Sequence, residues 1–421
     1  MNIHVPQNYD ARAELMSLAS TRYNIMGSQS SKSNISIVQD SLLGAYLMSL
    51  RSDIIPRNIY NDILLCGDEW DMNFINQKQR HITKTLTELG KDINLLYTGK
   101  GLLSMMLPDD LFYTKKTDAN PKEPFVRIYK GVLYEGAYNK SIIGSSHNSL
   151  IQILYKEYNE DICIKFINNI QFITNAWLCH YSFTIGLQDC IVKKGTDELI
   201  RKTVLRHFME AKNIEETTQH PRIKEARINA ALGKAKDIGM KIARESMDQD
   251  NGFVSTVTSG SKGDFFNIAQ IAGIVGQQNI SGHRIEPVLN RGLRTLPHYQ
   301  FGNLELEDEF ESRGFIRNSF LKGLNPKEFW FHSMSGREGV SDSAMKTADS
   351  GYIHRKMVKV LEDVQIKYDG TVRNSQGSII QWAYGDDDMN REQTVVLDQT
   401  SHMMDIGRLA DKLNAIYESE L

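Results

Sequence analysis

The sequence after residue 325 reads Pro326-Lys-Glu-Phe-Trp-Phe-His-Ser-Met-Ser-Gly-Arg-Glu-Gly-Val-Ser-Asp-Ser-Ala-Met-Lys-Thr-Ala-Asp-Ser-Gly-Tyr-Ile-His-Arg-Lys-Met-Val-Lys-Val-Leu361. Proline stands at its first position, where a helix tolerates it, and none recurs before Gly370. The spacing of the apolar residues predicts one long helix of about 40 residues, which would span roughly 60 Å. Such a helix is longer than a small domain is wide, so we expect it to cross a cleft or join two bodies.

Three glycines lie within this predicted helix, at positions 336, 339 and 351. Each costs roughly 1 kcal/mol relative to alanine in a helix interior, so together they predict close approach of another backbone or a bend. One face carries small residues and ends in a cation: Ala344, Ala348, Gly351 and Arg355. On physical grounds alone, the pattern favours a core helix in a helical domain.

The remaining sequence predicts a mixture of helices and one small sheet. Residues 41–48 and 147–190 have helical spacing, and residues 194–248 predict two long helices joined at His220-Pro221 as an antiparallel hairpin. Residues 125–134 predict a β-hairpin that turns at Lys130-Gly131. The predicted fold class is therefore α+β and predominantly helical, with a small sheet, a helical hairpin and one long helix.

Composition limits the classes of function. The chain has 421 residues, of which 41 % are hydrophobic and 24 % charged, so it folds into several modules. Its net charge of −3 excludes a uniformly basic body, so nucleic acid could be bound only by a local patch. The second helix of the hairpin carries a set of basic residues: Arg222, Lys224, Arg227, Lys234, Lys236 and Lys241. These residues could form a solvated face or line a channel for a polyanion.

The four cysteines are Cys66, Cys163, Cys179 and Cys190, and no C-x-x-C pair occurs. Their wide spacing argues against a structural zinc site and predicts reduced, buried thiols. The N-terminus has no charged leader followed by an apolar core, and no apolar run approaches the length of a membrane span. We therefore expect a protein that is neither secreted nor embedded in a membrane.

Two further motifs could carry chemistry. The run Tyr384-Gly-Asp-Asp-Asp-Met389 is similar to the Gly-Asp-Asp turn on which RNA-dependent polymerases bind magnesium, although such runs are also common in plain turns. The run Ser259-Gly-Ser-Lys-Gly263 places Lys262 before a predicted helix, where backbone N–H groups and a cation could meet a phosphate. It lacks Walker A spacing, and a tight turn that caps the helix is an equal alternative.

Taken together, these stretches resemble the largest subunit of multisubunit DNA-directed RNA polymerases, in collinear order over about residues 1–395. The resemblance is carried by Met1-Asn-Ile-His-Val-Pro-Gln7, Gly44-Ala-Tyr-Leu47, Thr98-Gly-Lys100, Phe183-Thr-Ile-Gly-Leu-Gln-Asp189, Ser259-Gly-Ser-Lys-Gly263, Arg294-Thr-Leu-Pro-His298, Gly336-Arg-Glu-Gly339 and Lys346-Thr-Ala-Asp-Ser-Gly-Tyr352. It implies five modules. These are the tail of the active-site barrel (1–60), a pore domain (61–192), a funnel (193–322), the bridge helix (323–370) and the start of the cleft (371–421).

The resemblance also implies roles for particular residues. Thr347 and Ala348 match bridge-helix positions beneath the template base, and Tyr352 matches the aromatic residue beside them. Lys262 matches a lysine near the pore through which nucleotides enter. The family's three magnesium-binding aspartates would precede Met1 and its trigger loop would follow Leu421, so the resemblance implies no catalytic and no metal-binding residue in this chain. The turn at Tyr384 matches a family turn without a metal role.

The implied partners are the remainder of the largest subunit, the second-largest subunit, template DNA, the RNA–DNA hybrid, nucleoside triphosphates and a factor that binds the pore. The implied cofactor is Mg²⁺ held elsewhere in the assembled enzyme. The implied location is cytoplasmic or nuclear, including a viral replication compartment. Two alternatives stay open, a free-standing non-catalytic nucleic-acid-binding protein and an unrelated helical scaffold.

Overall fold

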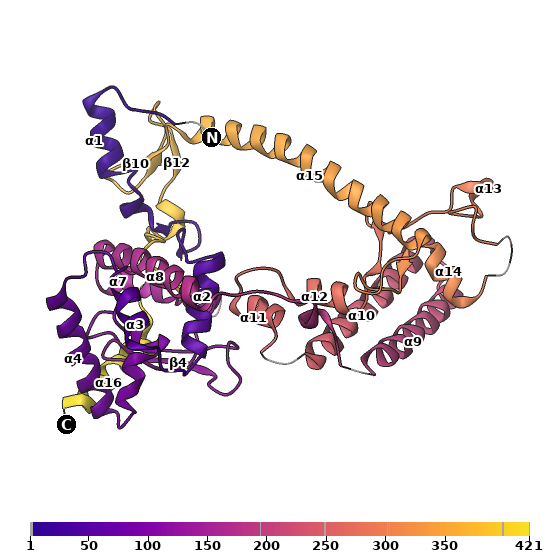
Figure 1. Ribbon diagram of the computed structural model, residues 1–421. Coiled ribbons are helices and arrows are strands. Elements are labelled where there is room, and N and C mark those ends of the chain that lie inside the picture. The colour runs from indigo at the N-terminus through magenta and orange to yellow at the C-terminus, as the bar shows by residue number, and fades with distance from the viewer. Residues whose placement is uncertain are drawn as a thin grey trace. The chain divides into compact units, whose positions relative to one another are not determined.

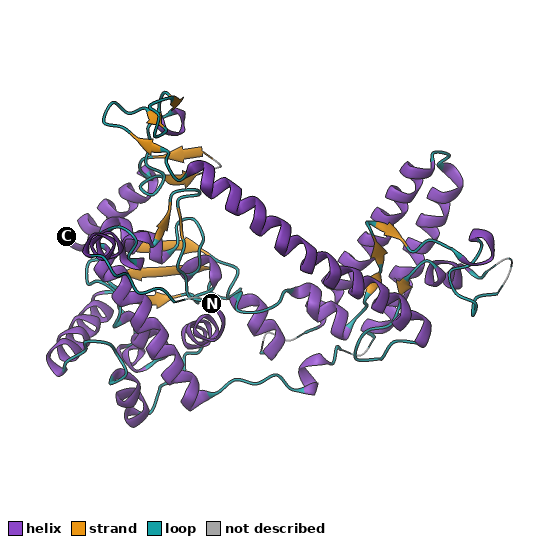
Figure 2. Cartoon of the chain, turned by 90° about the horizontal axis from the view of Figure 1, so that it is seen from above, coloured by secondary structure: helices purple, strands orange, loops and turns teal. Residues whose placement is uncertain are grey.

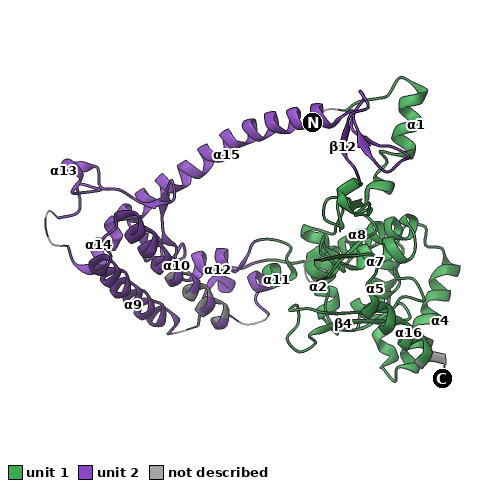
Figure 3. Cartoon of the chain, turned by 180° about the vertical axis from the view of Figure 1, so that it is seen from behind, with its two compact units in different colours: residues 1–184, 255–262, 383–421 green, residues 185–254, 263–382 purple. Residues whose placement is uncertain are grey.

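The computed structural model describes residues 3–193, 195–247, 250–300, 302, 304–397 and 400–420. They form two compact units, which Figure 3 distinguishes by colour. Unit 1 comprises residues 1–184, 255–262 and 383–421, and unit 2 comprises residues 185–254 and 263–382. In the part of the chain that the structure describes, no helix is long and apolar enough to cross a membrane.

Unit 1 is a group of helices packed with one small sheet. Its helices are α1 (Tyr9–Ser17), α2 (Gln39–Leu50), α3 (Arg57–Leu64), α4 (Met72–Glu88), α5 (Gly99–Ser104), α6 (Lys140–Ile143), α7 (Leu150–Glu157), α8 (Glu160–Tyr181) and α16 (Ile406–Glu420). Its sheet has the order β3 (Tyr113–Lys116), β4 (Phe125–Tyr129), β5 (Val132–Glu135). Two short antiparallel pairs accompany it: β1 (Met26–Gly27) with β2 (Lys32–Ser33), and β13 (Val395–Leu397) with β14 (Thr400–His402).

The predicted hairpin at Lys130-Gly131 is confirmed. Strands β4 and β5 pair antiparallel through Tyr129 and Val132, and both residues of the turn have positive φ, 45° at Lys130 and 70° at Gly131. Two consecutive positive φ values give a tight turn whose twist matches that of the flanking strands. Glycine at the second position adopts this conformation without steric cost.

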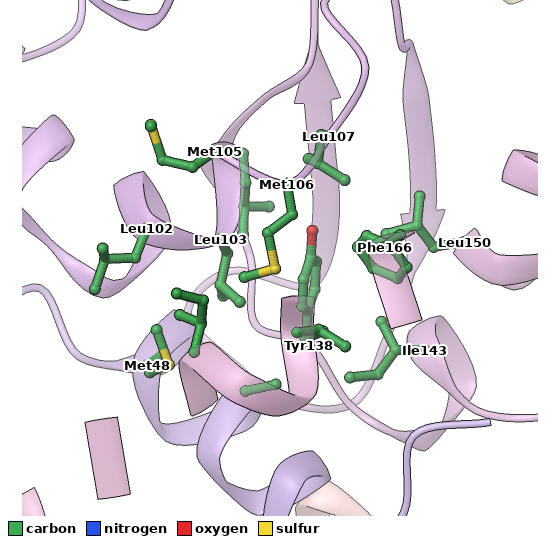
Figure 4. Close-up of a cluster of buried hydrophobic side chains, with 14 of the residues drawn as sticks. Met48, Leu102, Leu103, Met105, Met106, Leu107, Tyr138, Ile143, Leu150 and Phe166 are labelled. Atoms are coloured by element: carbon green, nitrogen blue, oxygen red, sulfur yellow. The ribbon is translucent and has the colours of Figure 1, made fainter. Parts of the chain in front are cut away.

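The core of unit 1 forms where α2 packs against α5 and α8, and α5 packs against β5. Figure 4 shows Tyr138 among Met106, Leu107 and Phe166, and the structure buries Tyr138 and Phe166 almost completely. Helix α5 lies so close to α2 that a Cβ at Gly99 would stand 2.2 Å from the carbonyl oxygen of Met48. Glycine is therefore required at position 99 by packing, since only a residue without a side chain allows this approach.

Unit 2 consists of a helical body, one long helix and a three-stranded sheet. The body contains α9 (Thr196–Thr217), α10 (Pro221–Ser246), α12 (Phe265–Ala272), α13 (Leu289–Gly292) and α14 (Leu306–Ser312). Short strands link its loops: β6 (Gly276–Gln277) pairs with β9 (Phe315–Ile316), and β7 (Asn279–Ile280) pairs with β8 (His283–Arg284). Helix α11 (Gly252–Ser259) is divided between the two units. Figure 2 shows how far helices outweigh strands, which confirms the predicted fold class.

The predicted hairpin of α9 and α10 is confirmed, and Pro221 is the first residue of α10. The buried face of α9 carries Ile200, Val204 and Phe208, as its spacing predicts. Phe208 stacks on Phe310 at 4.6 Å between ring centroids and meets the edge of Phe315 at 4.8 Å. These aromatic contacts join the hairpin to α14 and β9.

The long helix is confirmed as α15 (Pro326–Leu361), a single helix of 36 residues that Figure 1 shows leaving the helical body of unit 2. It ends nine residues before Gly370, earlier than the sequence predicts. The reason is local pairing, because β10 (Gln365–Ile366) forms an antiparallel sheet with β11 (Val372–Arg373) and β12 (Ile379–Gln381). Gly370 has φ of 79° and closes the turn between the first two strands.

The expectation of four buried thiols is wrong in part. All four cysteines are unpaired, but only Cys163 is buried, while Cys66 and Cys179 are exposed. Cys163 lies on the inner face of α8, and burial raises the pKa of its thiol to about 12. Cys163 and Cys179 occupy different faces of α8, and Cys66 lies in the turn after α3; cysteine spacing reveals neither placement.

Candidate functional site

The base of α15 is held by a buried carboxylate. Glu328 is 1 % exposed and accepts hydrogen bonds from the backbone N–H groups of Arg317 at 3.0 Å and Asn325 at 2.9 Å. It also accepts from the side-chain amide of Asn318 at 2.8 Å. Glu328 and Asn325 form a capping box, in which each side chain satisfies a backbone N–H of the other at the start of the helix.

A second buried carboxylate lies beside the first. Glu311 is 2 % exposed and accepts hydrogen bonds from the guanidinium of Arg317 at 2.9 Å and the hydroxyl of Tyr299 at 3.2 Å. The ammonium of Lys327 lies 3.0 Å from the same carboxylate and 4.4 Å from the centre of the Tyr299 ring. Burial, and then the charge of Glu311, raise the pKa of Tyr299. Because every buried charge here has a partner, the network fixes the first turn of α15 against the body of unit 2.

The next two turns of α15 contact the loop around β7. The Nδ1 atom of His332 lies 3.2 Å from Oε1 of Gln278, and the hydroxyl of Ser335 donates to the carbonyl of Asn279. Glu338 accepts from both the backbone N–H and the hydroxyl of Ser281, at 2.7 Å and 3.0 Å. These contacts extend the anchored part of the helix to about its fourth turn.

Beyond its anchored turns, α15 is open to solvent within this chain. From residue 341 to residue 361 every residue is exposed, including Tyr352 at 61 % and Val360 at 71 %. A Cβ built at Gly336, Gly339 or Gly351 would meet no atom within 4 Å, so among the described residues no other backbone makes the predicted close approach. A core helix is covered on most sides, whereas residues 341–361 are exposed. The interpretation of α15 as a core helix is therefore wrong.

The three residues predicted to position a template lie together on this exposed part. Thr347 and Ala348 are adjacent and exposed, and Tyr352 follows Ala348 by one helical turn. The hydroxyl of Thr347 donates to the carbonyl of Ser343 at 2.7 Å. The ammonium of Lys356 lies 3.9 Å from the centre of the Tyr352 ring, which places a cation beside the aromatic surface. The arrangement can therefore offer a small side chain, an aromatic ring and a positive charge to a ligand that lies along the helix.

Lys262 lies in unit 1, whereas α15 lies in unit 2. Its side chain is exposed in a tight turn between Gly260, with φ of 77°, and Gly263, with φ of 69°. The carboxylate of Asp264 accepts from the backbone N–H groups of Phe266 and Asn267 at the start of α12. The geometry is that of a turn followed by a capped helix, because the N–H groups that a phosphate would need already have an acceptor.

In the acidic turn at Tyr384-Gly-Asp-Asp-Asp-Met389, two carboxylates make local contacts. Asp387 pairs with Arg391 at 2.6 Å, and Asp388 accepts from the backbone N–H of Tyr384 at 3.0 Å. Asp386 adopts positive φ within the turn. Among the described residues, no group of three or more histidines, cysteines and carboxylates is arranged to hold a metal ion. This turn therefore does not fit a magnesium site.

The basic residues of α10 divide between ion pairs and solvent. Lys224 lies 3.7 Å from Glu215, and Lys241 lies 4.0 Å from Glu245. Arg222, Arg227 and Lys234 are exposed, and the side chain of Lys236 lies outside the described residues. Exposed cations of this kind are compatible with a solvated face and with the lining of a polyanion channel alike.

The two buried carboxylates at the base of α15 are not among the residues predicted from the sequence. A signal for Glu328 exists in the sequence, because an asparagine followed three residues later by glutamate is a capping-box pattern. No comparable signal marks Glu311, whose partners Tyr299, Arg317 and Lys327 come from separate segments.

Comparison with known proteins adds three family matches in collinear order. Residues 24–190 match the family described as RNA polymerase Rpb1, domain 3, residues 209–316 match domain 4, and residues 323–410 match domain 5. The alternative of an unrelated helical scaffold is therefore excluded.

Individual relatives agree with these matches. The chain is similar to the probable DNA-directed RNA polymerase II subunit RPB1 homolog of Invertebrate iridescent virus 6, at 42 % identity over 100 % of this chain and 42 % of that protein. It is also similar to the DNA-directed RNA polymerase II subunits RPB1-A and RPB1-B of Trypanosoma brucei brucei, at 34 % identity over 93 % of this chain and 22 % of each. The chain thus spans less than half the length of these relatives.

Proposed function

Because the chain belongs to the family of the largest subunits of DNA-directed RNA polymerases, we propose that it forms the pore, the funnel and the bridge helix for template-directed RNA synthesis. The observation that carries this proposal is α15, which is anchored at its base by buried charges and exposed along the rest of its length. A helix held in this way can present side chains to a nucleic acid without depending on that nucleic acid to fold.

The proposed modules follow the chain in order. They are a tail of the active-site barrel (1–60), a pore domain (61–192), a funnel (193–322), the bridge helix (323–370) and the start of the cleft (371–421). The order of the three family matches supports this division. The pairing of α9 with α10, both within the proposed funnel, supports it further.

Within the bridge helix, Thr347, Ala348 and Tyr352 are proposed to support the template base at the insertion site. A small residue at position 348 leaves space for a base that must pass the helix at each step of synthesis. Lys262 is proposed to attract triphosphates at the pore, because its exposed ammonium offers a positive charge to a polyanion. The Mg²⁺ of the reaction is proposed to be held by other parts of the polymerase.

The proposed partners are the rest of the largest subunit, the second-largest subunit, template DNA, the RNA–DNA hybrid, nucleoside triphosphates and a factor that binds the pore. The proposed location is the nucleus or a viral replication site. Reconstitution tests the function: a polymerase assembled with this chain should elongate RNA, and omission of the chain should abolish elongation. If the chain binds DNA but never enters such an assembly, it is instead a free-standing, non-catalytic binding protein.

The purified chain alone is expected to extend no primer at any magnesium concentration. The physical reason is that its described carboxylates form no cluster able to hold the metal ions of phosphoryl transfer. Primer extension in Mg²⁺ with labelled nucleotides provides the measurement. Extension that disappears in the double variant Asp386→Ala, Asp387→Ala would show that the acidic turn is catalytic after all.

The isolated chain is also expected to bind an apolar dye such as anilinonaphthalene sulfonate and to unfold readily. Helix α1 buries none of its residues, and Ile3, Tyr9 and Met16 around it are 92 %, 86 % and 66 % exposed. Apolar surface on this scale indicates a missing partner. Dye fluorescence should fall when partner subunits are added. A monomer that binds no dye and unfolds sharply would contradict the expectation.

A further inference from the structure

The proposed funnel contains, within unit 2, a polar pocket of about 650 Å³ that is lined by none of the residues proposed above to contact the template or to attract triphosphates. It lies between the end of α9, the segment after β8 and the end of α14. Four cations line it: Lys212, Arg284, Arg294 and Arg313. Two carboxylates line it as well, those of Glu215 and Glu309.

The two lining carboxylates are already paired. Glu309 lies 3.2 Å from the ammonium of Lys212, and Glu215 lies 3.7 Å from the ammonium of Lys224. Arg294 donates to the carbonyl oxygen of Tyr299 at 3.2 Å, which fixes its side chain in the wall. A backbone carbonyl does not neutralise a guanidinium, so Arg294 contributes a positive charge to the pocket beside Arg284 and Arg313.

Arg284 and Arg313 share a single carboxylate. Arg284 is 6 % exposed and binds Glu225 with two hydrogen bonds of 2.8 Å. Arg313 reaches the same carboxylate only at 4.0 Å, and its buried Nε atom has no hydrogen-bond partner among the described residues. Glu225 therefore hydrogen-bonds Arg284, and the buried Nε–H of Arg313 is left without an acceptor among the described residues, at a place where burial strengthens electrostatic interactions.

The charges that act on Glu225 and Arg313 also shift their pKa values. Burial alone would raise the pKa of Glu225, but the hydrogen bonds and charge of Arg284 hold it below its ordinary value, so the carboxylate is ionised. Burial, followed by repulsion from Arg284, lowers the pKa of Arg313, and the charges of Glu225, Glu215 and Glu286 oppose this shift. Arginine nevertheless remains charged at neutral pH.

We propose that this pocket binds a small phosphate-bearing anion, with the guanidinium of Arg313 as its principal contact. Guanidinium groups suit phosphate because their planar fork offers two parallel hydrogen bonds. The volume lies within the roughly 300–1,000 Å³ of small-molecule sites and exceeds the need of one phosphate, which favours a di- or triphosphate group. A concave pocket of this size favours a small anion over a nucleic-acid backbone. The proposal does not depend on polymerase activity.

Calorimetric titration of the full chain with pyrophosphate tests the site. The variant Arg313→Gln is expected to weaken binding by about tenfold or more, since hydrogen bonds to charged groups are among the strong ones. The control is Arg206→Gln, an exposed arginine of α9 outside the pocket, which should leave binding unchanged. Titrations with ATP and with adenosine distinguish a free diphosphate from a nucleotide as the source of the phosphate.

Thermal unfolding supplies a second readout. Arg313→Gln leaves the hydrogen bonds between Arg284 and Glu225 in place, so the variant is expected to fold, and pyrophosphate should raise the thermal midpoint of the unmodified chain but not that of the variant. If Arg313→Gln fails to fold, the affinity of Arg313→Lys for pyrophosphate is compared with that of Arg206→Lys. Lysine retains the charge but lacks the planar fork, so only the change at position 313 should weaken binding. Absence of pyrophosphate binding, equal weakening by both glutamine variants, or binding of an oligonucleotide alone would overturn the proposal.

Discussion

Replacing Ala348 with tryptophan is expected to stall nucleotide addition by the assembled polymerase while the chain itself remains folded. Ala348 is exposed on α15, so a bulky side chain at this position can extend into solvent. The penalty of typically 1–3 kcal/mol for overpacking a core therefore does not apply. If the helix supports the template base, the same side chain blocks the path of the nucleic acid, and a displaced reactant can cost on the order of 100-fold in rate.

Two measurements separate folding from function at this position. The thermal midpoint of the chain should be unchanged, and the rate of single-nucleotide addition by the reconstituted enzyme should fall. Ser350→Trp is a matched control, because it adds the same side chain two residues along the exposed helix, about 200° around its axis. A loss of stability with a normal rate per folded enzyme would refute the assignment of Ala348 to the template path.

Local sequence rules predicted the elements that depend on a few neighbouring residues. Proline at position 221 begins a helix, and Lys130-Gly131 closes a hairpin through backbone conformations that glycine favours. The absence of proline after position 326 likewise predicts that α15 is continuous, because proline would interrupt a helix. The helix ends earlier than the sequence predicts, because Gln365 and Ile366 form a strand that pairs with Val372 and Arg373. Periodicity does not reveal this pairing.

Tertiary contacts determined what the sequence could not predict. The pattern of apolar residues in α15 is compatible with a core helix, yet Val340, Met345 and Met357 are all more than half exposed. Apolar spacing indicates that a face needs a partner, but it does not say whether the partner belongs to the same chain. The template-positioning roles of Thr347, Ala348 and Tyr352 therefore remain predictions that rest on family resemblance and on their exposure.

The base of α15 is the place where a single substitution should cost most in stability. Replacing Glu328 with alanine is expected to lower the free energy of unfolding by about 3 kcal/mol or more. The carboxylate is 1 % exposed and accepts from the backbone N–H groups of Arg317 and Asn325 and from the side chain of Asn318. Its removal leaves those donors buried without an acceptor, and it deletes the capping box that begins the helix.

Urea unfolding of the full chain measures this loss, and hydrogen exchange locates it. Glu328→Ala should speed exchange in the first turns of α15, whereas Glu362→Ala, which removes an exposed carboxylate paired with Lys359, should change little. Glu328→Gln retains the shape but places an amide against several donors, so it should recover only part of the lost stability. If Glu328→Ala behaved like Glu362→Ala, the buried charges would not be what anchors the helix. Its direction from the body of unit 2 would then have to be fixed by the contacts of His332, Ser335 and Glu338.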